Sequence, residues 1–420
     1  MSVIIAMLDI VKGGMSMKKM AALVMGTALF FGVGATFGGV YVANATTKQE
    51  NAIECTQIEK ANMAQELQIR AKASYLMDFA SQTVMHAQNE RERLPIASMC
   101  KVMTLLLSFE ALERGDFQID DVICVSERAA SMGGSQVFLE ANAKYSVKEL
   151  IKSIIVCSAN DSCVAMAEKI SGSESIFVEK MNEKAKELGL SDTLFANCTG
   201  LPKEPQYSCA RDVAVMLKAL LQHELYFELG KVWMDKFEHP GGRYTEITNT
   251  NKLVRFYDGC DGGKTGFTNE AGFCLAATAK RNNMRIISVV IGEKTSAERF
   301  DDVKTMFDYA FANYFVTPIL HSGEVLDEKV LVNGGKKKDI EVCSQRDVTI
   351  FSKRGEKPNV TLEKRMQKLK APVKKEDTVG ELIVFKDGVE IERVCLLAAE
   401  DVKEASFMDR LKKIARNWNA

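Results

Sequence analysis

Histidine is scarce in this chain, with only four residues among 420, and none of them has the sequence context of a Ser-His-Asp hydrolase. No Cys-x-x-Cys pair occurs, which argues against a zinc knuckle or a thioredoxin-like redox site. We therefore expect no metal and no cofactor. Lysine and arginine (55) are balanced by aspartate and glutamate (56), so the chain lacks the positive field that attracts nucleic acid, and we expect no nucleic-acid partner.

Proline is also rare, with 7 residues, whereas 46% of the residues are hydrophobic and 26% are charged. This composition is too apolar for a disordered chain and too charged for a polytopic membrane protein. At roughly 150 residues per domain, the length indicates two or three globular domains.

The N-terminal region contains a long uncharged stretch, from Met20 to Thr47, directly after two lysines. It ends in Ala43-Asn44-Ala45, an A-x-A pattern typical of signal-peptide cleavage. The run is long enough to cross a bilayer, so an uncleaved anchor is the alternative. We expect residues 1–45 to be a signal peptide or membrane anchor, with translation starting at Met15 or Met17. Residues 46–70 would be a linker, and the protein would lie in the cell wall or on the outer face of the cytoplasmic membrane.

The eleven cysteines are an odd number and are scattered along the chain. A chain of this length has no need of disulfides for stability. We therefore favour free and mostly buried thiols over a disulfide framework.

Residues 71–316 contain strand patterns, then helical patterns, then strand patterns again and a final helix. Strands are expected at 72–79, 82–88, 271–280 and 284–292, and helices at 97–113, within 127–230 and at 297–314. The pair Asn282-Asn283 predicts a hairpin between the last two strands. This order predicts an α+β fold, in which helices cover an antiparallel sheet.

Residues 319–398 form short alternating runs with the turn pairs Asn333-Gly334 and Asp387-Gly388, which predict a small all-β domain. Residues 399–420 place apolar side chains on one helical face and lysines and arginines on the rest. This expected amphipathic helix could lie on a membrane surface or pack on the β domain, and the sequence does not distinguish the two.

The first candidate catalytic pair is Ser98 and Lys101, in the segment SMCKVMTLLLSF. Lys101 is the only charged residue in a pattern that is apolar almost all round, so we expect its helix to be buried. Burial disfavours the charged ammonium, and a neutral amine can act as a general base. Three residues apart, both side chains share one helix face. The sequence therefore predicts a serine nucleophile with a lysine base, although a capping serine beside a surface lysine would give the same spacing.

Two further triplets follow, each weak by itself. Ser158-Ala159-Asn160 lies between two helical patterns, where a hydroxyl and an amide could face a cleft. Lys264-Thr265-Gly266 leads into a strand pattern, where a cation and a hydroxyl suit a substrate carboxylate and the glycine permits close approach.

The order and spacing of the three motifs resemble those of the penicillin-binding-protein and serine β-lactamase superfamily. The similarity is greater to low-molecular-mass D-alanyl-D-alanine carboxypeptidases, through the segments 248–266 and 284–292 among others, and it covers about residues 72–400. It implies cleavage of peptidoglycan stem peptides that end in D-Ala-D-Ala, with β-lactam antibiotics as inhibitors.

The resemblance also implies roles for individual residues. Ser98 would be acylated, Lys101 would accept its proton, and Ser158 with Asn160 would form the second catalytic element. The substrate would be held by Lys264, Thr265, Gly266, Phe267 and Arg299, with the backbone N–H groups of Ser98 and Phe267 as the oxyanion hole. For Arg299 an ordinary surface charge is the alternative.

Two other functions remain open from the sequence. A β-lactamase needs a carboxylate for fast deacylation, and Glu187 imitates such a motif faintly, at the end of a pattern that predicts a solvent-facing helix. A non-catalytic wall-binding protein would keep the cleft without the chemistry, which the presence of all the motif side chains disfavours.

Overall fold

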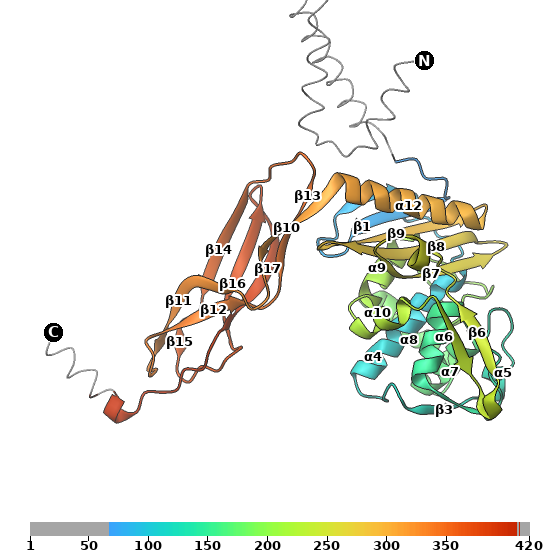
Figure 1. Cartoon of the computed structure of the whole chain (residues 1–420), viewed down its shortest axis with the longest axis horizontal. Helices are drawn as coiled ribbons and strands as arrows, with labels where there is room; N and C mark the ends of the chain where they lie inside the picture. Colours follow the sequence, from blue (N-terminus) through green and yellow to red (C-terminus); the bar gives the residue numbers. More distant parts are fainter. Residues whose placement is uncertain (1–66, 410, 412–420) are drawn as a thin grey trace, which may run out of the picture. The chain divides into compact units, whose positions relative to one another are not determined.

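A computed structural model describes residues 67–409 and 411 (Figure 1). The expected signal peptide or anchor and most of the expected linker lie outside the described residues. Within them, no helix combines the length and the apolarity that crossing a membrane requires.

The first part of the described chain is built on a five-stranded antiparallel sheet. The strand order is β2-β1-β9-β8-β7, with bounds β1 Ala73–Asp78, β2 Val84–Gln88, β7 Cys260–Thr268, β8 Gly272–Arg281 and β9 Met284–Glu293. Arg281 pairs with Met284 across the turn that begins at Asn282, whose φ is 51°. The four expected strands and the hairpin are confirmed.

Helices cover both faces of this sheet because side chains alternate between the faces along each strand. Leu275 and Ala277 pack with α12 (Ser296–Asn313), whereas Cys274 and Ala276 belong to the larger core on the opposite face. That core contains the other long helices, which Figure 1 shows below the sheet: α4 Lys101–Glu113, α6 Val147–Cys157, α7 Asn160–Ser171, α8 Glu174–Glu187, α9 Ala210–Leu220 and α10 Glu224–Gly230. The expected α+β class is confirmed.

Short elements complete this part. They are α5 Glu127–Ala130, α11 Leu253–Phe256, the 3-10 turn η2 Pro240–Gly242, and the two-stranded pairs β3 Val122–Cys124 with β4 Lys144–Ser146 and β5 Met234–Glu238 with β6 Tyr244–Thr248.

The helix expected over 97–113 is divided. Ala97–Cys100 form a 3-10 turn, η1, and the α-helix α4 starts at Lys101. Ala97 has a φ of 47°, in the left-handed region that is unfavourable for a residue with a Cβ atom. Ser98 therefore lies in a tight turn before the α-helix, rather than in its first α-helical turn.

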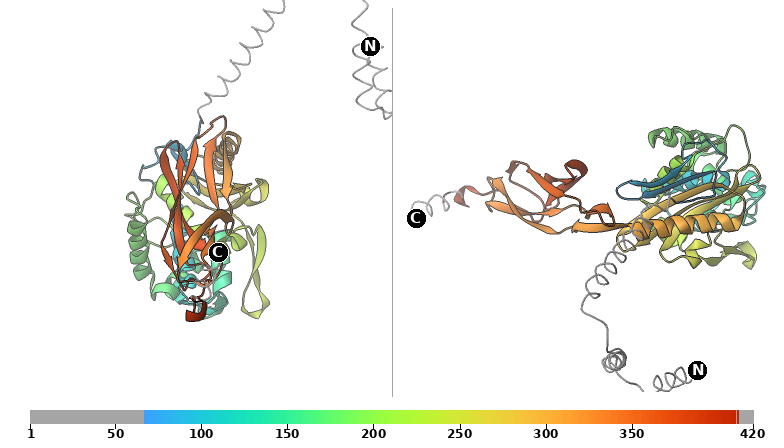
Figure 2. Two further views of the ribbon diagram at one scale, coloured as in Figure 1. Left: turned by 90° about the vertical axis from the view of Figure 1, so that its left-hand side faces the viewer. Right: turned by 90° about the horizontal axis from the view of Figure 1, so that it is seen from above.

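The second part of the chain is all β. Its strands are β10 Tyr314–Leu320, β11 Val325–Asn333, β12 Asp339–Ser344, β13 Val348–Lys353, β14 Val360–Met366, β15 Leu369–Lys370, β16 Thr378–Lys386 and β17 Val389–Ala398 (Figure 2). Six of them form a sheet in the order β14-β16-β17-β12-β11-β15, and β10 pairs with β13. Asp387 and Gly388, both with positive φ, form the turn between β16 and β17 as the sequence predicts.

The β domain extends beyond residue 398. Val402 bridges to Val373 and is buried in the core of this domain, so it does not belong to the expected C-terminal helix. The described helical residues begin at Phe407, after Ser406, whose Oγ accepts a hydrogen bond from Asp409 N. The rest of the expected helix, residues 410 and 412–420, lies outside the described residues.

All ten cysteines in the described ranges are free thiols, and six of these are buried. This agrees with the expectation of buried thiols over a disulfide framework.

Candidate active site

The nucleophile candidate and its base are in direct contact. Lys101 Nζ donates a hydrogen bond to Ser98 Oγ at 2.9 Å and another to the carbonyl oxygen of Thr199 at 2.5 Å. Lys101 has no exposed surface, whereas Ser98 is half-buried. The amine thus lies in the core and the hydroxyl remains accessible, as a serine nucleophile with a buried base requires.

The segment 197–200 holds the Lys101 side of the site in place. Asn197 Oδ1 accepts hydrogen bonds from the backbone N–H groups of Thr199 and Gly200, at 3.1 and 2.7 Å. A Cβ atom on Gly200 would lie 1.9 Å from the carbonyl oxygen of Ala97, so only glycine lets this segment pass against η1. The sequence alone does not indicate that the backbone of this segment binds Lys101.

Ser158 and Asn160 lie at the junction of two helices. Ser158 ends α6 in the left-handed conformation, with φ 66° and ψ 32°, and Asn160 begins α7. Both are buried, yet the Oγ of Ser158 and the Oδ1 of Asn160 have no hydrogen-bond partner within the described residues. Buried polar atoms are normally satisfied, so these two atoms are available for a ligand.

Asp161 belongs to none of the three motifs, so the sequence does not mark it as a site residue. Its buried carboxylate accepts hydrogen bonds from the backbone N–H groups of Val137 and Leu139, both at 3.1 Å. Asn160 Nδ2 donates to the carbonyl oxygen of Gly133 at 2.7 Å. Together they fix the loop 133–139 against the junction, and burial raises the pKa of Asp161.

Lys264, Thr265 and Gly266 lie inside the edge strand β7, which the sequence pattern did not predict as a separate strand. Burial, followed by the positive charge of Lys101, lowers the pKa of Lys264 well below its usual value. Thr265 Oγ1 donates a hydrogen bond to Thr250 Oγ1 at 2.8 Å.

Gly266 brings β7 against η1, the turn that contains Ser98. A Cβ atom at this position would lie 2.6 Å from the carbonyl oxygen of Ile96, which no larger residue could tolerate. The next residue, Phe267, is 50% exposed and stacks on Phe273 with ring centroids 4.3 Å apart. The backbone of β7 therefore runs directly beside Ser98.

Arg299 is not a surface charge, since it is 8% exposed. Its Nη1 donates to the carbonyl oxygen of Gly266 at 3.2 Å, and its Nε has no partner within the described residues. Burial lowers its pKa to about 10. The structure thus brings the N-terminal turn of α12 to the strand that carries the third motif.

Glu187 lies elsewhere on the surface. It ends α8, its side chain is 65% exposed, and it forms an ion pair with Lys184 at 2.7 Å. No described contact links it to Ser98, so the structure gives it no part in deacylation.

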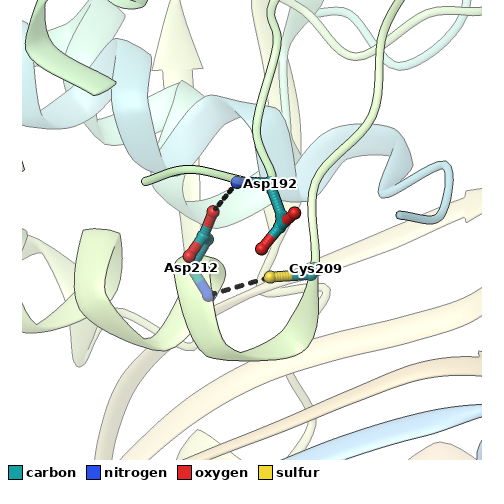
Figure 3. A group of neighbouring side chains, drawn as sticks. All are labelled: Asp192, Cys209 and Asp212. Atoms are coloured by element: carbon teal, nitrogen blue, oxygen red, sulfur yellow. Dashed lines mark hydrogen bonds between the residues drawn. The ribbon is translucent and has the colours of Figure 1, made fainter. Parts of the chain in front are cut away.

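One cluster has the composition of a metal site, namely Asp192, Cys209 and Asp212 (Figure 3). Its groups already bind one another and their neighbours. Asp212 Oδ2 accepts from Asp192 N at 2.9 Å, Cys209 Sγ caps α9 by accepting from Asp212 N at 3.4 Å, and Arg91 pairs with Asp192 at 2.9 Å. These contacts explain the cluster as the start of α9, and we assign it no metal.

Comparisons with known proteins agree with this geometry. The family model described as D-alanyl-D-alanine carboxypeptidase matches residues 60–295, and that of the penicillin-binding protein 5 C-terminal domain matches residues 314–404. The chain is 43% identical over 355 residues to D-alanyl-D-alanine carboxypeptidase DacF of Bacillus subtilis, covering 84% of this chain and 91% of DacF. It is 32% identical to DacC of Escherichia coli, covering 82% and 87% of the two chains.

A solved structure has the same architecture. Penicillin binding protein 5 from Haemophilus influenzae superimposes with a TM-score of 0.64 at 31% identity, covering 81% of this chain and 100% of that chain. The chain therefore belongs to the D-alanyl-D-alanine carboxypeptidase family and is a serine-type D-Ala-D-Ala carboxypeptidase with a C-terminal domain of the penicillin-binding protein 5 type.

Proposed function

We propose that this protein removes the terminal D-alanine from peptidoglycan stem pentapeptides through an acyl-enzyme on Ser98, and that β-lactams acylate the same serine. One observation carries the assignment: Nζ of the fully buried Lys101 lies 2.9 Å from the accessible Oγ of Ser98, within hydrogen-bond distance. A nucleophile paired with an adjacent base is the arrangement that acyl transfer requires.

The reaction begins when Lys101 Nζ, as the neutral amine, accepts the proton of Ser98 Oγ. Oγ then forms a bond to the carbonyl carbon of the penultimate D-alanine. The backbone N–H groups of Ser98 and Phe267 stabilise the resulting oxyanion.

Collapse of this intermediate breaks the peptide bond, and the leaving amine of D-alanine must receive a proton. Ser158 is suited to relay it from Lys101, because its buried Oγ has no partner within the described residues. Water then hydrolyses the ester and returns Ser98 to its starting state. Lys264, Thr265 and Arg299 would hold the terminal carboxylate, since hydrogen bonds between a cation and a carboxylate are the strong ones.

Mass spectrometry of residues 46–420 tests this proposal. With a pentapeptide that ends in D-Ala-D-Ala we expect loss of a single D-alanine, and with penicillin we expect one adduct on Ser98. An adduct that maps to another serine would refute the assignment of the nucleophile.

We infer that the protein is exported, on the evidence of the uncharged stretch and the A-x-A pattern that ends at Ala45. Peptidoglycan peptides, the substrates of the family, lie outside the cytoplasmic membrane. N-terminal sequencing of the mature protein should find Thr46 as its first residue if the signal is cleaved.

We further propose that the C-terminal segment contacts a membrane surface. Phe407, Met408 and Leu411 are 75%, 60% and 44% exposed, which is unusual for large apolar side chains. Co-sedimentation with vesicles that contain anionic lipid should be lost when Phe407 and Met408 are both changed to serine. Unchanged sedimentation would indicate that this segment does not bind lipid.

A further inference from the structure

A cavity of about 380 Å³ opens beside η1, the turn that contains Ser98. Ala97 and Gly200 form its inner wall next to Ser98. Thr268, the last residue of β7, lines one side, and the exposed Lys203, Glu204 and Glu270 line the rim. No step of the proposed mechanism uses this cavity. Its volume lies within the range of small-ligand sites.

The direction of β7 determines which part of a substrate reaches the cavity. In the proposed mechanism the terminal carboxylate lies at Lys264 and Thr265, and the scissile carbonyl lies at Ser98 and Phe267. A peptide held in this way runs antiparallel to β7, as a strand added to the edge of a sheet. Its N-terminal part then extends past Thr268 and into the cavity.

The lengths agree with this path. An extended peptide rises about 3.3 Å per residue, so Thr268 lies about 10 Å along the strand from Thr265. The third residue of a pentapeptide is two positions before the C-terminal residue, about 7 Å from it by the same rise. Its backbone stops about 3 Å short of Thr268 by this rise, a gap that a long side chain spans, so its side chain is the first that can reach the cavity.

The rim charges are unpaired. Lys203, Glu204 and Glu270 are exposed, and none forms an ion pair with any residue in the described ranges, where many other surface charges do. Two carboxylates and one ammonium around a small cavity complement a side chain that carries an amine, and also one that carries an amine and a carboxylate together.

We propose that this cavity is a specificity site for the third residue of the stem peptide, and that it recognises a side chain ending in both an amine and a carboxylate, as in diaminopimelate. The inference rests on the proposed function, which sets the direction of the substrate. Glu204 and Glu270 bind the amine, and Lys203 binds the carboxylate.

Steady-state kinetics with three substrates test the proposal. The substrates are pentapeptides with diaminopimelate or L-lysine at position three, and an N-acylated D-Ala-D-Ala dipeptide that is too short to reach the cavity. Glu204→Gln and Glu270→Gln should each lower kcat/KM about 2- to 5-fold for both pentapeptides, the size expected for an exposed ion pair. Lys203→Gln should lower it only for the diaminopimelate peptide. All three variants should cleave the dipeptide as the wild type does.

Glu183→Gln is the matched control, because Glu183 is an exposed glutamate of α8 without an ion pair among the described residues. Equal losses on the dipeptide and the pentapeptides, or losses no greater than those of Glu183→Gln, would overturn this inference while leaving the proposed function intact. A wild-type protein that penicillin does not acylate would overturn the proposed function, and this inference with it.

Discussion

Two residues of the site adopt backbone conformations that are unfavourable for a side chain. Ala97, which precedes Ser98, has φ 47°, and Ser158 has φ 66°. Such conformations cost on the order of 1–3 kcal/mol each and persist only where the surroundings enforce them. Gly200 and Gly266 pack closely against the turn that contains Ala97, and the α6–α7 junction constrains the backbone of Ser158. These two strained conformations place the hydroxyls of Ser98 and Ser158 in the site.

Replacing Lys101 by arginine should abolish acylation by penicillin. A guanidinium cannot lose its proton near neutral pH and so cannot accept the proton of Ser98. Stopped-flow or mass-spectrometric measurement of the adduct checks this, with the melting temperature as a control for folding. Acylation of a folded Lys101→Arg protein at the wild-type rate would contradict a lysine base.

Ser158→Ala should raise stability and lower turnover. The buried Oγ has no partner within the described residues, so its removal should stabilise the fold by roughly 1 kcal/mol. The proton relay is lost at the same time, so kcat should fall. Thermal unfolding and peptide hydrolysis measure the two effects, and a variant that is both less stable and fully active would show that the hydroxyl is structural.

Arg299→Ala should lower kcat/KM about 10- to 150-fold, because a hydrogen bond to a charged group contributes roughly 1.5–3 kcal/mol. The loss should be confined to peptides with a free terminal carboxylate. Arg299 could bind the substrate carboxylate or only hold β7 through the carbonyl oxygen of Gly266. Comparing the acid and amide forms of one peptide separates these two roles. Equal losses for both forms would mean that Arg299 acts only by holding the carbonyl oxygen of Gly266.

At the scale of elements, three segments meet at the site: η1, the α6–α7 junction and the edge strand β7. Sequence patterns predicted most of the sheet but not β7 as a separate strand, because CDGGKTGFT has three glycines and no alternation of apolar and polar residues. Gly263 and Gly266 are needed because β7 passes between β8 and η1 with no room for larger residues, and Gly262 packs against the ring of Tyr226. The glycines that prevent β7 from being predicted as a strand are thus the residues that let it pack in this position.

Gly200→Ala tests this close packing. A Cβ atom would lie 1.9 Å from Ala97 O, at a φ of 79°, so η1 would have to move. Acylation should fall steeply, and the protein should be destabilised by more than the roughly 1 kcal/mol of the backbone conformation alone.

Gly172→Ala is the matched control, since Gly172 has a φ of 77° with nothing within 4 Å of the added Cβ atom. It should show the backbone cost without loss of acylation, when both variants are compared by thermal unfolding and by penicillin labelling. Similar behaviour of the two variants would refute the steric argument.

At the scale of the whole molecule, the start of the described chain is tied to α12. Arg70 donates two side-chain hydrogen bonds to Asp302 Oδ1, at 2.8 and 2.6 Å, and Ile69 is buried in the core between α12 and the sheet. Glu293, at the end of β9, lies beside this pair. Burial, with the hydrogen bond and charge of Asp302, raises the pKa of Glu293 to about 8 from its usual 4.5.

Stability should therefore decline as the pH rises from about 4.5 to about 8. In this window the unfolded chain has lost the proton of Glu293 and the folded protein retains it, so raising the pH favours unfolding. Glu293→Gln mimics the protonated acid and should raise the melting temperature at pH 9 with little change at pH 5. Glu183→Gln serves as the control, and an equal response of both variants would contradict the assignment to Glu293.

The sequence by itself determined the α+β class, the all-β second domain and the residues of the three motifs. These follow from periodicity, turn pairs and motif order, which are local properties of the chain. Only the tertiary structure decided that Lys101 binds Thr199 O, that Asp161 fixes the loop 133–139, and that Arg299 is buried against Gly266. Each of these contacts joins segments that are 22 to 98 residues apart, so packing, not local pattern, creates them.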